Sequence, residues 1–470
     1  MGYLDDRFHG TVDSGGAGVH VMEHVEVEDG RSRLKWRVVA SFAALLATTL
    51  ALSCTGEPPS AIKTVETGEF AEFPDATSDL GWRQWGGPGG DFKIPSVVLA
   101  DSWPRGGPPL IWSRPLGEGY SAIVYDLGAL VTIWRDGPED VVTALRADDG
   151  ATIWEYRYPV KIHEKNMLDY GSGPHATPLI LGDRVITLGF GGTLNCMELK
   201  TGRLLWSLDL ISDLDGQVLD FGNSASPITY RENVIILTGG SRQAVAALDP
   251  ADGSVIWRSR PGSVSYGTPI VIDLDGQDQL VYQSEYEIVG LDAQNGAHLW
   301  SHPCVNENRD NVSNPIWGED HLLWASTQPD GGTRVIRLER VERGTEATEI
   351  WSSHRISIHF WSALRLDDHV YASIGGQGRV FACVDVRTGE IEWRKRGFEK
   401  VNFVHAGDET IFLDADGELT LARLSPGEIT ILSRATIADG PTWTVPTLVG
   451  TTLYVRDKKT IRALDLSAGI

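Results

Sequence analysis

A short phrase that ends in tryptophan recurs along this chain and limits its possible folds more than any other feature. Five copies read LRADDGATIW, MELKTGRLLW, LDPADGSVIW, LDAQNGAHLW and CVDVRTGEIEW, and in each a glycine stands four residues before the tryptophan. A degenerate copy ends at Trp351, and the later phrase LSPGEITIL lacks the tryptophan. Self-similarity of this kind is typical of repeat architectures. The chain is therefore predicted to consist of repeated units.

Each phrase predicts two strands joined by a tight turn. Alternating apolar runs such as RVFACVDV and EIEWRKR flank the turn, as in half-buried strands. Asp-Gly, Asn-Gly and Thr-Gly supply the positive φ that a hairpin turn needs. A tryptophan at one place in every unit is predicted to pack between units rather than to contact a cofactor. The residues given this structural role are Gly150, Trp154, Gly202, Trp206, Gly253, Trp257, Gly296, Trp300, Trp351, Gly389 and Trp393.

The spacing of the phrases predicts a β-propeller. Their tryptophans follow one another at intervals of 42 to 52 residues, the pitch of one four-stranded blade. Eight apolar runs, from GYSAIVY to WTVPTLVGTTLYV, start the innermost strands, and the last blade is one strand short. The segment PPLIWSRPL, with Trp112, supplies that strand and removes two free sheet edges. Residues 108–466 are therefore predicted to form one closed, all-β, eight-bladed propeller of four-stranded antiparallel blades.

Composition agrees with such a fold and restricts the partners. The 52 glycines and 23 prolines supply many turns. The formal net charge of −23 argues against nucleic acid, whose binding needs clustered lysine and arginine. We expect a monomeric propeller that does not bind nucleic acid.

The first residues have the features of an export signal. An acidic leader is followed by RSRLKWR, by the apolar run 38–52 and by SCTGEPPS. The run is shorter than the roughly 20 residues of a membrane span. The ending Ala51-Leu52-Ser53-Cys54 resembles a bacterial lipobox, in which the cysteine is lipidated. Export without lipid and an uncleaved signal anchor remain alternatives.

This N-terminal region therefore divides into three predicted parts. Residues 1–53 are the acidic leader and the export signal, predicted to be of the lipoprotein type, residues 54–79 a flexible tether, and residues 80–107 a preface packed on the propeller. Lipidation is expected at Cys54. The propeller is expected in the cell envelope, on the periplasmic side, attached to a bacterial membrane by its lipid alone.

The repeat Leu-Asp-x-x-x-Gly-x-x-x-Trp resembles that of the PQQ-like (quinoprotein-type) β-propellers, and the resemblance spans nearly all of residues 80–466. It extends to outer-membrane assembly lipoproteins of the BamB type, which are non-enzymatic eight-bladed scaffolds. This implies a binding or scaffolding module for proteins or surface polymers, reached through the blade loops. The alternative that the resemblance also implies is a dehydrogenase of sugars or alcohols that uses pyrroloquinoline quinone with calcium.

Several absences in the sequence favour the scaffold. Quinoprotein dehydrogenases carry two adjacent cysteines over the cofactor, and here Cys54, Cys196, Cys304 and Cys383 are all far apart. No Gly-x-Ser-x-Gly, His-Glu-x-x-His or P-loop is present. No Cys-x-x-Cys or Cys-His spacing suggests a metal site. We expect no catalytic residue, no cofactor and no metal.

A binding surface is expected where the eight innermost strands begin, around the axis. By the blade register, the residues at or near this rim are Tyr120, His175, Ser226, Tyr266, Asn314, His359, Trp361, His405 and Trp443. They form either a binding funnel or the lining of a water-filled channel. The three histidines come from blades that are not all adjacent, so a shared metal site is not expected.

Overall fold

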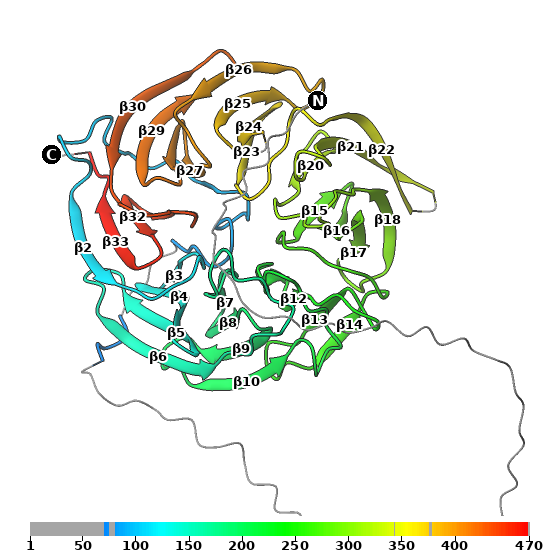
Figure 1. Cartoon of the computed structure of the whole chain (residues 1–470), viewed down its shortest axis with the longest axis horizontal. Coiled ribbons are helices and arrows are strands. Elements are labelled where there is room, and N and C mark those ends of the chain that lie inside the picture. The colour runs from blue at the N-terminus through cyan, green and yellow to red at the C-terminus, as the bar shows by residue number, and fades with distance from the viewer. Residues whose placement is uncertain (1–69, 75–79, 343, 376–377, 469–470) are drawn as a thin grey trace, which may run out of the picture. The chain divides into compact units, whose positions relative to one another are not determined.

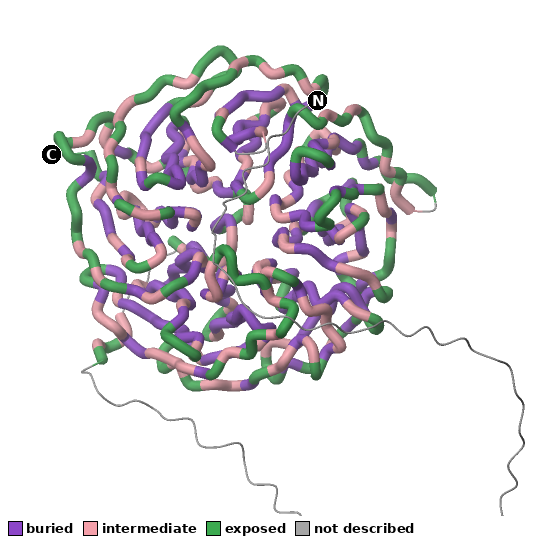
Figure 2. Tube along the Cα trace, viewed as in Figure 1, coloured by how far each residue is buried: buried purple, intermediate pink, exposed green. Residues whose placement is uncertain are grey.

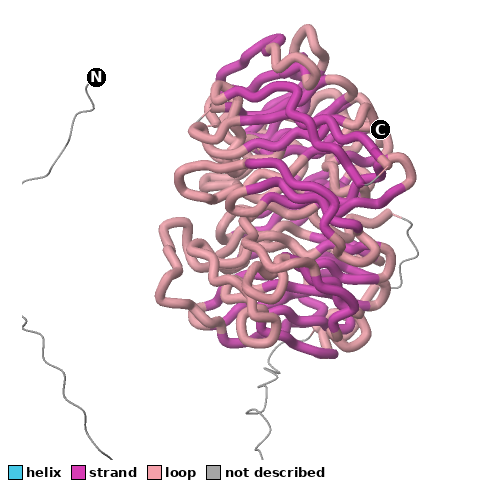
Figure 3. Tube along the Cα trace, turned by 90° about the vertical axis from the view of Figure 1, so that its right-hand side faces the viewer, coloured by secondary structure: helices cyan, strands magenta, loops and turns pink. Residues whose placement is uncertain are grey.

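Thirty-three strands build the described part of the chain. The structure is a computed structural model that describes residues 70–74, 80–342, 344–375 and 378–468, all within the unit Ile62–Ile470. Figure 3 shows strands and loops but no α-helix among these residues, and none of them forms a helix long and apolar enough to cross a membrane. The predicted leader, Cys54 and most of the predicted tether lie outside the described residues.

The strands form eight sheets arranged in a ring around a central axis (Figure 1). The first four blades contain β3 (Val124–Asp126), β4 (Ala129–Asp136), β5 (Glu139–Arg146) and β6 (Thr152–Pro159); β7 (Leu179–Leu181), β8 (Arg184–Leu188), β9 (Thr193–Glu198) and β10 (Leu204–Asp209); β11 (Ile228–Tyr230), β12 (Asn233–Leu237), β13 (Val245–Leu248) and β14 (Val255–Arg258); and β15 (Ile270–Leu274), β16 (Gln277–Gln283), β17 (Glu287–Asp292) and β18 (His298–Pro303).

The next three blades contain β19 (Ile316–Trp317), β20 (Leu322–Ser326), β21 (Thr333–Val341) and β22 (Gly344–Ser353); β23 (Ala363–Leu366), β24 (His369–Ile374), β25 (Val380–Asp385) and β26 (Ile391–Arg396); and β27 (Asn402–Ala406), β28 (Glu409–Leu413), β29 (Glu418–Leu424) and β30 (Ile429–Thr436). The eighth contains β31 (Thr447–Val449), β32 (Thr452–Arg456), β33 (Thr460–Asp465) and β2 (Leu110–Pro115). The predicted eight-bladed propeller is confirmed.

The ring closes through β2, as predicted. This strand pairs antiparallel with β33, Trp112 opposite Ala463, so the outermost strand of the last blade comes from near the start of the propeller. In Figure 1, β2 in blue lies beside β33 in red. The last blade therefore has four strands like the others, and the edge of β33 is paired rather than open to pairing with another chain.

Arg456 of β32 joins the last blade to the first across this seam. Its side chain is fully buried, and its guanidinium donates hydrogen bonds to acceptors in the first blade and the loop before it, at 3.0 to 3.3 Å. The five acceptors are the carbonyl oxygens of Gly117, Gly119, Ser121 and Ile133 and the hydroxyl of Thr132. Burial lowers the pKa of Arg456 to about 9, so the group stays charged at neutral pH.

Tryptophan and glycine of neighbouring blades meet in most of the junctions. The Trp154 indole donates a 2.8 Å hydrogen bond to Leu199 of the next blade, and a Cβ on Gly202 there would lie 2.5 Å from the indole ring. Gly202 also has a φ of +69°, so a side chain at this position is disfavoured both by the nearby indole ring and by the backbone conformation. The same approach of a ring to a glycine joins Trp112 to Gly150, Trp206 to Gly253, Trp257 to Gly296 and Trp351 to Gly389.

The junction between the fourth and fifth blades is built differently. The degenerate phrase of the fifth blade has no glycine in register, and Trp300 donates instead to Gln279 Oε1 of its own blade, at 2.8 Å. Gln279 Nε2 in turn donates to Thr345 Oγ1 of the fifth blade, also at 2.8 Å. A fully buried glutamine thus links two blades where the repeat has lost its glycine.

One blade has a fifth strand that was not predicted from the sequence. β1 (Lys93–Ile94) pairs in parallel with β27, Lys93 opposite His405, at the innermost edge of the seventh blade. Beside it, Phe92 is buried against Phe403, with ring centroids 6.3 Å apart. The preface thus adds backbone pairing at the innermost edge of this blade, and Trp82 also exchanges backbone hydrogen bonds with Tyr125 of β3 in the first blade.

The core lies between and within the blades. Nearly every residue of the middle strands is buried. In the outermost strands, partly buried residues alternate with exposed ones or the strand faces solvent, as the purple interior and green rim of Figure 2 show. Both faces of a middle strand meet neighbouring blades, which is why runs such as Ala129–Val131 are apolar and buried.

Candidate functional site

A chain of hydrogen bonds ties the beginnings of the innermost strands together around one end of the axis. Thr177 Oγ1 accepts from the Ala122 N–H at 3.3 Å, and Ser226 Oγ accepts from the Thr177 N–H at 3.0 Å. Thr268 and Asn314 continue the pattern, each accepting from the strand start before it at 3.0 Å. Small polar residues at these positions therefore fix the spacing of the blades.

The second half of the ring uses Asn402 in the same way. Its Oδ1 accepts from the Ser362 hydroxyl at 2.8 Å, and its Nδ2 donates to the Trp443 carbonyl at 3.0 Å. Thr444 Oγ1 then donates to the Tyr120 carbonyl at 3.3 Å, which brings the pattern back to the first blade. The loops that carry these residues are held in fixed positions around the axis.

These loops enclose a cavity of about 170 Å³. Most of its lining residues belong to the connections that lead into seven of the eight innermost strands. The one remaining lining residue, Trp85, belongs to the preface. The lining residues are Trp85, Tyr120, Tyr170, His175, Phe221, Ser224, Ser226, Tyr266, Thr268, Asp310, Val312, Asn314, Phe360, Trp361 and Trp443.

Most of the residues predicted from the blade register line this cavity. They are Tyr120, His175, Ser226, Tyr266, Asn314, Trp361 and Trp443. His359 does not line it: its ring stacks on Phe360, and its Nε2 lies 3.7 Å from Asp310 Oδ2. His405 lies inside β27, where its Nδ1 is 2.9 Å from Thr410 Oγ1. The position in the seventh blade that matches Ser226 and Asn314 is Asn402, three residues earlier.

Several lining residues were not predicted from the sequence. Tyr170, Phe221 and Phe360 stand in long interblade connections, where no periodic pattern marks which side chain points inward. Trp85 stands in the preface segment WRQWGGPGGD, which was predicted to pack on the propeller but not to lie at the axis. The glycines around Trp85 were the available signal, since close approach of backbone to other groups favours glycine.

The wall of the cavity is largely a set of touching aromatic rings. Trp443 stacks on Tyr120 with centroids 5.1 Å apart and meets Tyr170 edge-on at 5.9 Å. Tyr170 also lies 5.5 Å from Phe221 and 5.6 Å from Phe360. These separations are those of favourable aromatic pairs.

Trp85 closes the cavity toward the other face of the propeller. It lines this cavity and a second one of about 230 Å³, whose walls include Gly89 and Gly90 of the same segment. The Trp85 ring is held edge-on against Phe92, with centroids 5.5 Å apart. The preface thus divides the axial space in two.

The titratable groups of the lining are mostly neutral at pH 7. Burial lowers the pKa of His175 to about 4, with help from the positive charge of Arg135. Burial raises the pKa of Tyr120 and of Tyr266 to about 12. Among the lining residues Asp310 is the one carboxylate, and it accepts a hydrogen bond from Gln328. The cavity is therefore an apolar, aromatic site with a single acidic group.

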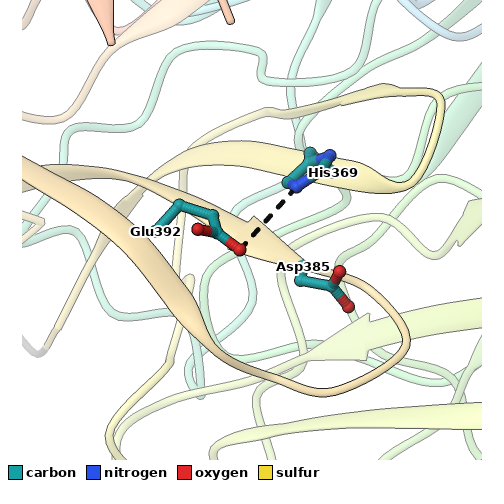
Figure 4. A group of neighbouring side chains, drawn as sticks. All are labelled: His369, Asp385 and Glu392. Carbon is teal, nitrogen blue, oxygen red and sulfur yellow. Dashed lines mark ion pairs between the residues drawn. The ribbon is translucent and has the colours of Figure 1, made fainter. Parts of the chain in front are cut away.

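A second group of side chains, at the opposite end of the sixth blade, brings three potential metal ligands together (Figure 4). His369, Asp385 and Glu392 place ligand atoms within 4.8 Å of one another. Asp385 Oδ1 accepts the backbone N–H groups of Arg387 and Thr388, each at 2.8 Å, which is how the turn of the repeated phrase is capped. Those hydrogen bonds account for Asp385 without an ion, and we assign this group a structural role.

Comparison with known proteins gives a family for the chain. A family model described as "Outer membrane protein assembly factor BamB" matches residues 104–263, 138–357 and 328–436. The BamB protein of Yersinia pestis is 25% identical over 282 residues, which cover 57% of this chain and 67% of that protein. The quinohemoprotein alcohol dehydrogenase ADH-IIG of Pseudomonas putida is 27% identical over 222 residues, which cover 45% of this chain but only 30% of the enzyme.

Solved structures show the same fold. BamB from Moraxella catarrhalis superposes with a TM-score of 0.54 at 18% identity, covering 76% of this chain and 99% of that one. Quinohemoprotein alcohol dehydrogenase from Comamonas testosteroni gives 0.55 at 14% identity, covering 84% and 82%. Identities this low establish the architecture and not the activity. Because the family model matches more than half of its length, the chain belongs to the family of the outer membrane protein assembly factor BamB.

Proposed function

We propose that this protein is a non-enzymatic binding or scaffolding module of the cell envelope. It engages its partner through the axial face, which is the face of the propeller where the innermost strands begin and the cavity opens. The observation that carries the proposal is the cavity in which aromatic rings from several interblade loops meet on a rigid ring of blades. Buried aromatic clusters of this kind supply much of the binding energy at protein interfaces. The comparisons support the scaffold through the BamB family and leave the partner open.

The alternative function is oxidation with pyrroloquinoline quinone and calcium, and the lining does not fit it. In enzymes of that type a carboxylate and an amide hold the calcium beside a catalytic aspartate. Here Asp310 is the one lining carboxylate, and the amide oxygen of Asn314 already accepts the Thr268 N–H. The cavity of about 170 Å³ is also smaller than the roughly 300–1,000 Å³ of sites for drug-sized ligands. We therefore derive no chemical step through this cofactor.

The proposal includes export and a lipid anchor at Cys54, supported by the lipobox-like segment and by the envelope protein that gives the family its name. Cells fed a labelled fatty acid should incorporate the label into the full-length protein, and Cys54→Ser should abolish incorporation and release the protein from the membrane fraction. Undiminished labelling of Cys54→Ser would remove the anchor from the proposal.

Site-specific photo-crosslinking in cells tests the use of the axial face. A photoreactive phenylalanine analogue replaces Phe360 at the cavity mouth or, as a matched control, Ile431 on the outer strand β30; these side chains are 39% and 41% exposed. We expect a discrete adduct from position 360 and none from position 431. Equal adducts from both positions, or none from position 360, would contradict binding at the axial face.

A further inference from the structure

The size of the axial cavity indicates what part of a partner it accepts. A dry engineered cavity of about 150 Å³ binds benzene, and the axial cavity has about 170 Å³. It therefore has room for roughly one aromatic side chain. A ligand that is larger must leave most of its surface outside, on the face around the mouth.

That face is apolar next to the mouth. Tyr170 and Phe360, which both line the cavity, are still 37% and 39% exposed. Met167 and Leu168, in the same connection as Tyr170, are 44% and 46% exposed, and the Met167 N–H is held by the Asp220 carbonyl at 2.6 Å. Exposed apolar residues grouped in this way mark an interaction surface. Met167, Leu168, Tyr170 and Phe360 thus form an apolar collar around the mouth. This collar extends the cavity into a surface that suits a segment of polypeptide chain.

Two lysines stand over the rings of the cavity. Lys400 Nζ lies 5.2 Å from the centroid of Trp361 and 5.9 Å from that of Trp443, and Lys458 Nζ lies 5.8 Å from that of Tyr120. Lys400 precedes the innermost strand β27, and Lys458 is in the turn from β32 to β33, which lies at the same end of a blade because β32 runs antiparallel to β31. Both lysines therefore belong to the axial face.

The ammonium groups of these lysines have no acidic partner among the described residues. Neither forms an ion pair or a hydrogen bond with the described residues, although the chain has 64 acidic residues against 41 basic ones. Cations left without a partner on an acidic protein favour a ligand that carries negative charge and disfavour a cationic one.

Several polar groups of the lining are already used within the protein. Ser226, Thr268 and Asn314 each use an oxygen to accept a backbone N–H of the neighbouring blade. Ser224 Oγ donates to the Tyr266 carbonyl at 3.0 Å. These oxygens hold the strand starts and loops together, whereas aromatic rings supply most of the surface that a ligand in the cavity contacts, which favours an aromatic group.

We propose that the axial cavity binds one aromatic side chain of an acidic peptide segment in a partner protein, and that Lys400 and Lys458 pair with carboxylates on either side of that aromatic anchor. This inference rests on the proposed binding function and specifies its ligand. The apolar collar contacts the peptide around the anchor, and the neighbouring carboxylates set the register of the segment.

Calorimetric titration of the full-length protein with blocked tripeptides tests the inference. The probe is acetyl-Asp-Phe-Asp-amide, compared with the same peptide carrying alanine in the centre or lysine at both ends. Burial of a phenylalanine side chain predicts that the alanine peptide binds at least about tenfold more weakly. Lys400→Gln and Lys458→Gln should each weaken the probe about two- to fivefold at low salt, and added salt should shrink that difference.

The matched control is Lys395→Gln, an exposed lysine on the outer strand β26, which should leave binding unchanged. A thermal melt of each variant establishes that it is folded. Equal binding of the lysine-flanked peptide, or lysine variants that bind the probe like wild type, would overturn the inference. Phenylacetate that binds as tightly as the tripeptide would also overturn it, because the ligand would then be a small aromatic acid.

The failure of this inference can be told apart from failure of the proposed function. If the acidic probe does not bind while the photo-crosslink from position 360 still yields its adduct, the inference fails and the binding function stands. If neither is seen, both fail.

Discussion

Replacing Arg456 with methionine should weaken the seam that closes the propeller. The guanidinium reaches five acceptors in the first blade and the loop before it, and no carboxylate neutralises it by a hydrogen bond. Methionine has a similar length and an apolar end, so it fills much of the space while donating nothing. The change removes every hydrogen bond that this side chain makes across the seam.

The structure sets the expected magnitude. The carbonyl oxygens of Gly117 and Gly119 accept hydrogen bonds from no other described residue. A carbonyl left without a donor costs about 1–3 kcal/mol, and somewhat less where water reaches it, as at the half-buried Gly117. The free energy of unfolding should therefore fall by about 2–5 kcal/mol. Lysine at position 456 should recover only part of this, because it lacks the planar set of five donors.

Urea unfolding at neutral pH, followed by tryptophan fluorescence, measures the effect. Arg394→Met, an exposed arginine on β26, is the control and should stay within about 0.5 kcal/mol of wild type. A shifted midpoint with an unchanged slope against urea means that stability alone has changed. An Arg456→Met protein as stable as the control would refute the idea that this arginine holds the seam.

Three further predictions concern other parts of the fold. Gly202→Ala should lower the free energy of unfolding, measured with urea, by about 2–4 kcal/mol, because the new Cβ meets the Trp154 ring. Gly276→Ala should lower it by less, because Gly276 has a similar φ of +77° but open space around it. Cys196, whose pKa burial raises to about 12, should react with a thiol reagent only after unfolding; rapid reaction of the folded protein would contradict its burial. Because the pKa of His175 is about 4 when folded and near 6.5 when unfolded, stability should be lost as pH falls from 6.5 to 4, and His175→Asn should flatten that loss relative to wild type.

The parts of the fold that depend on local rules could be predicted from the sequence. The turn glycines, the strand alternation and the tryptophan spacing all act over a few residues, and they led to eight blades closed by β2. The parallel strand β1 was not predicted, because two residues of the preface carry no pattern and the free inner edge that they pair with is a tertiary feature.

The candidate site was predictable where a residue stands in register with a strand start. Tyr120, Tyr266 and Trp443 follow that register and line the cavity. Tyr170 and Phe360 lie in irregular loops whose paths are set by contacts with other blades, so counting from the strands does not place them. Trp85 depends on where the preface crosses the axis, which no periodicity records.

The measurement that tests the central claim most directly asks whether the protein binds or catalyses. Full-length protein is incubated with pyrroloquinoline quinone and calcium, passed through a gel-filtration column, and examined for retained quinone absorbance and for dye reduction with a panel of sugars and alcohols. A binding module with a cavity of about 170 Å³ should retain no quinone and reduce no dye. Retention of one quinone per chain together with turnover of any substrate would contradict the account.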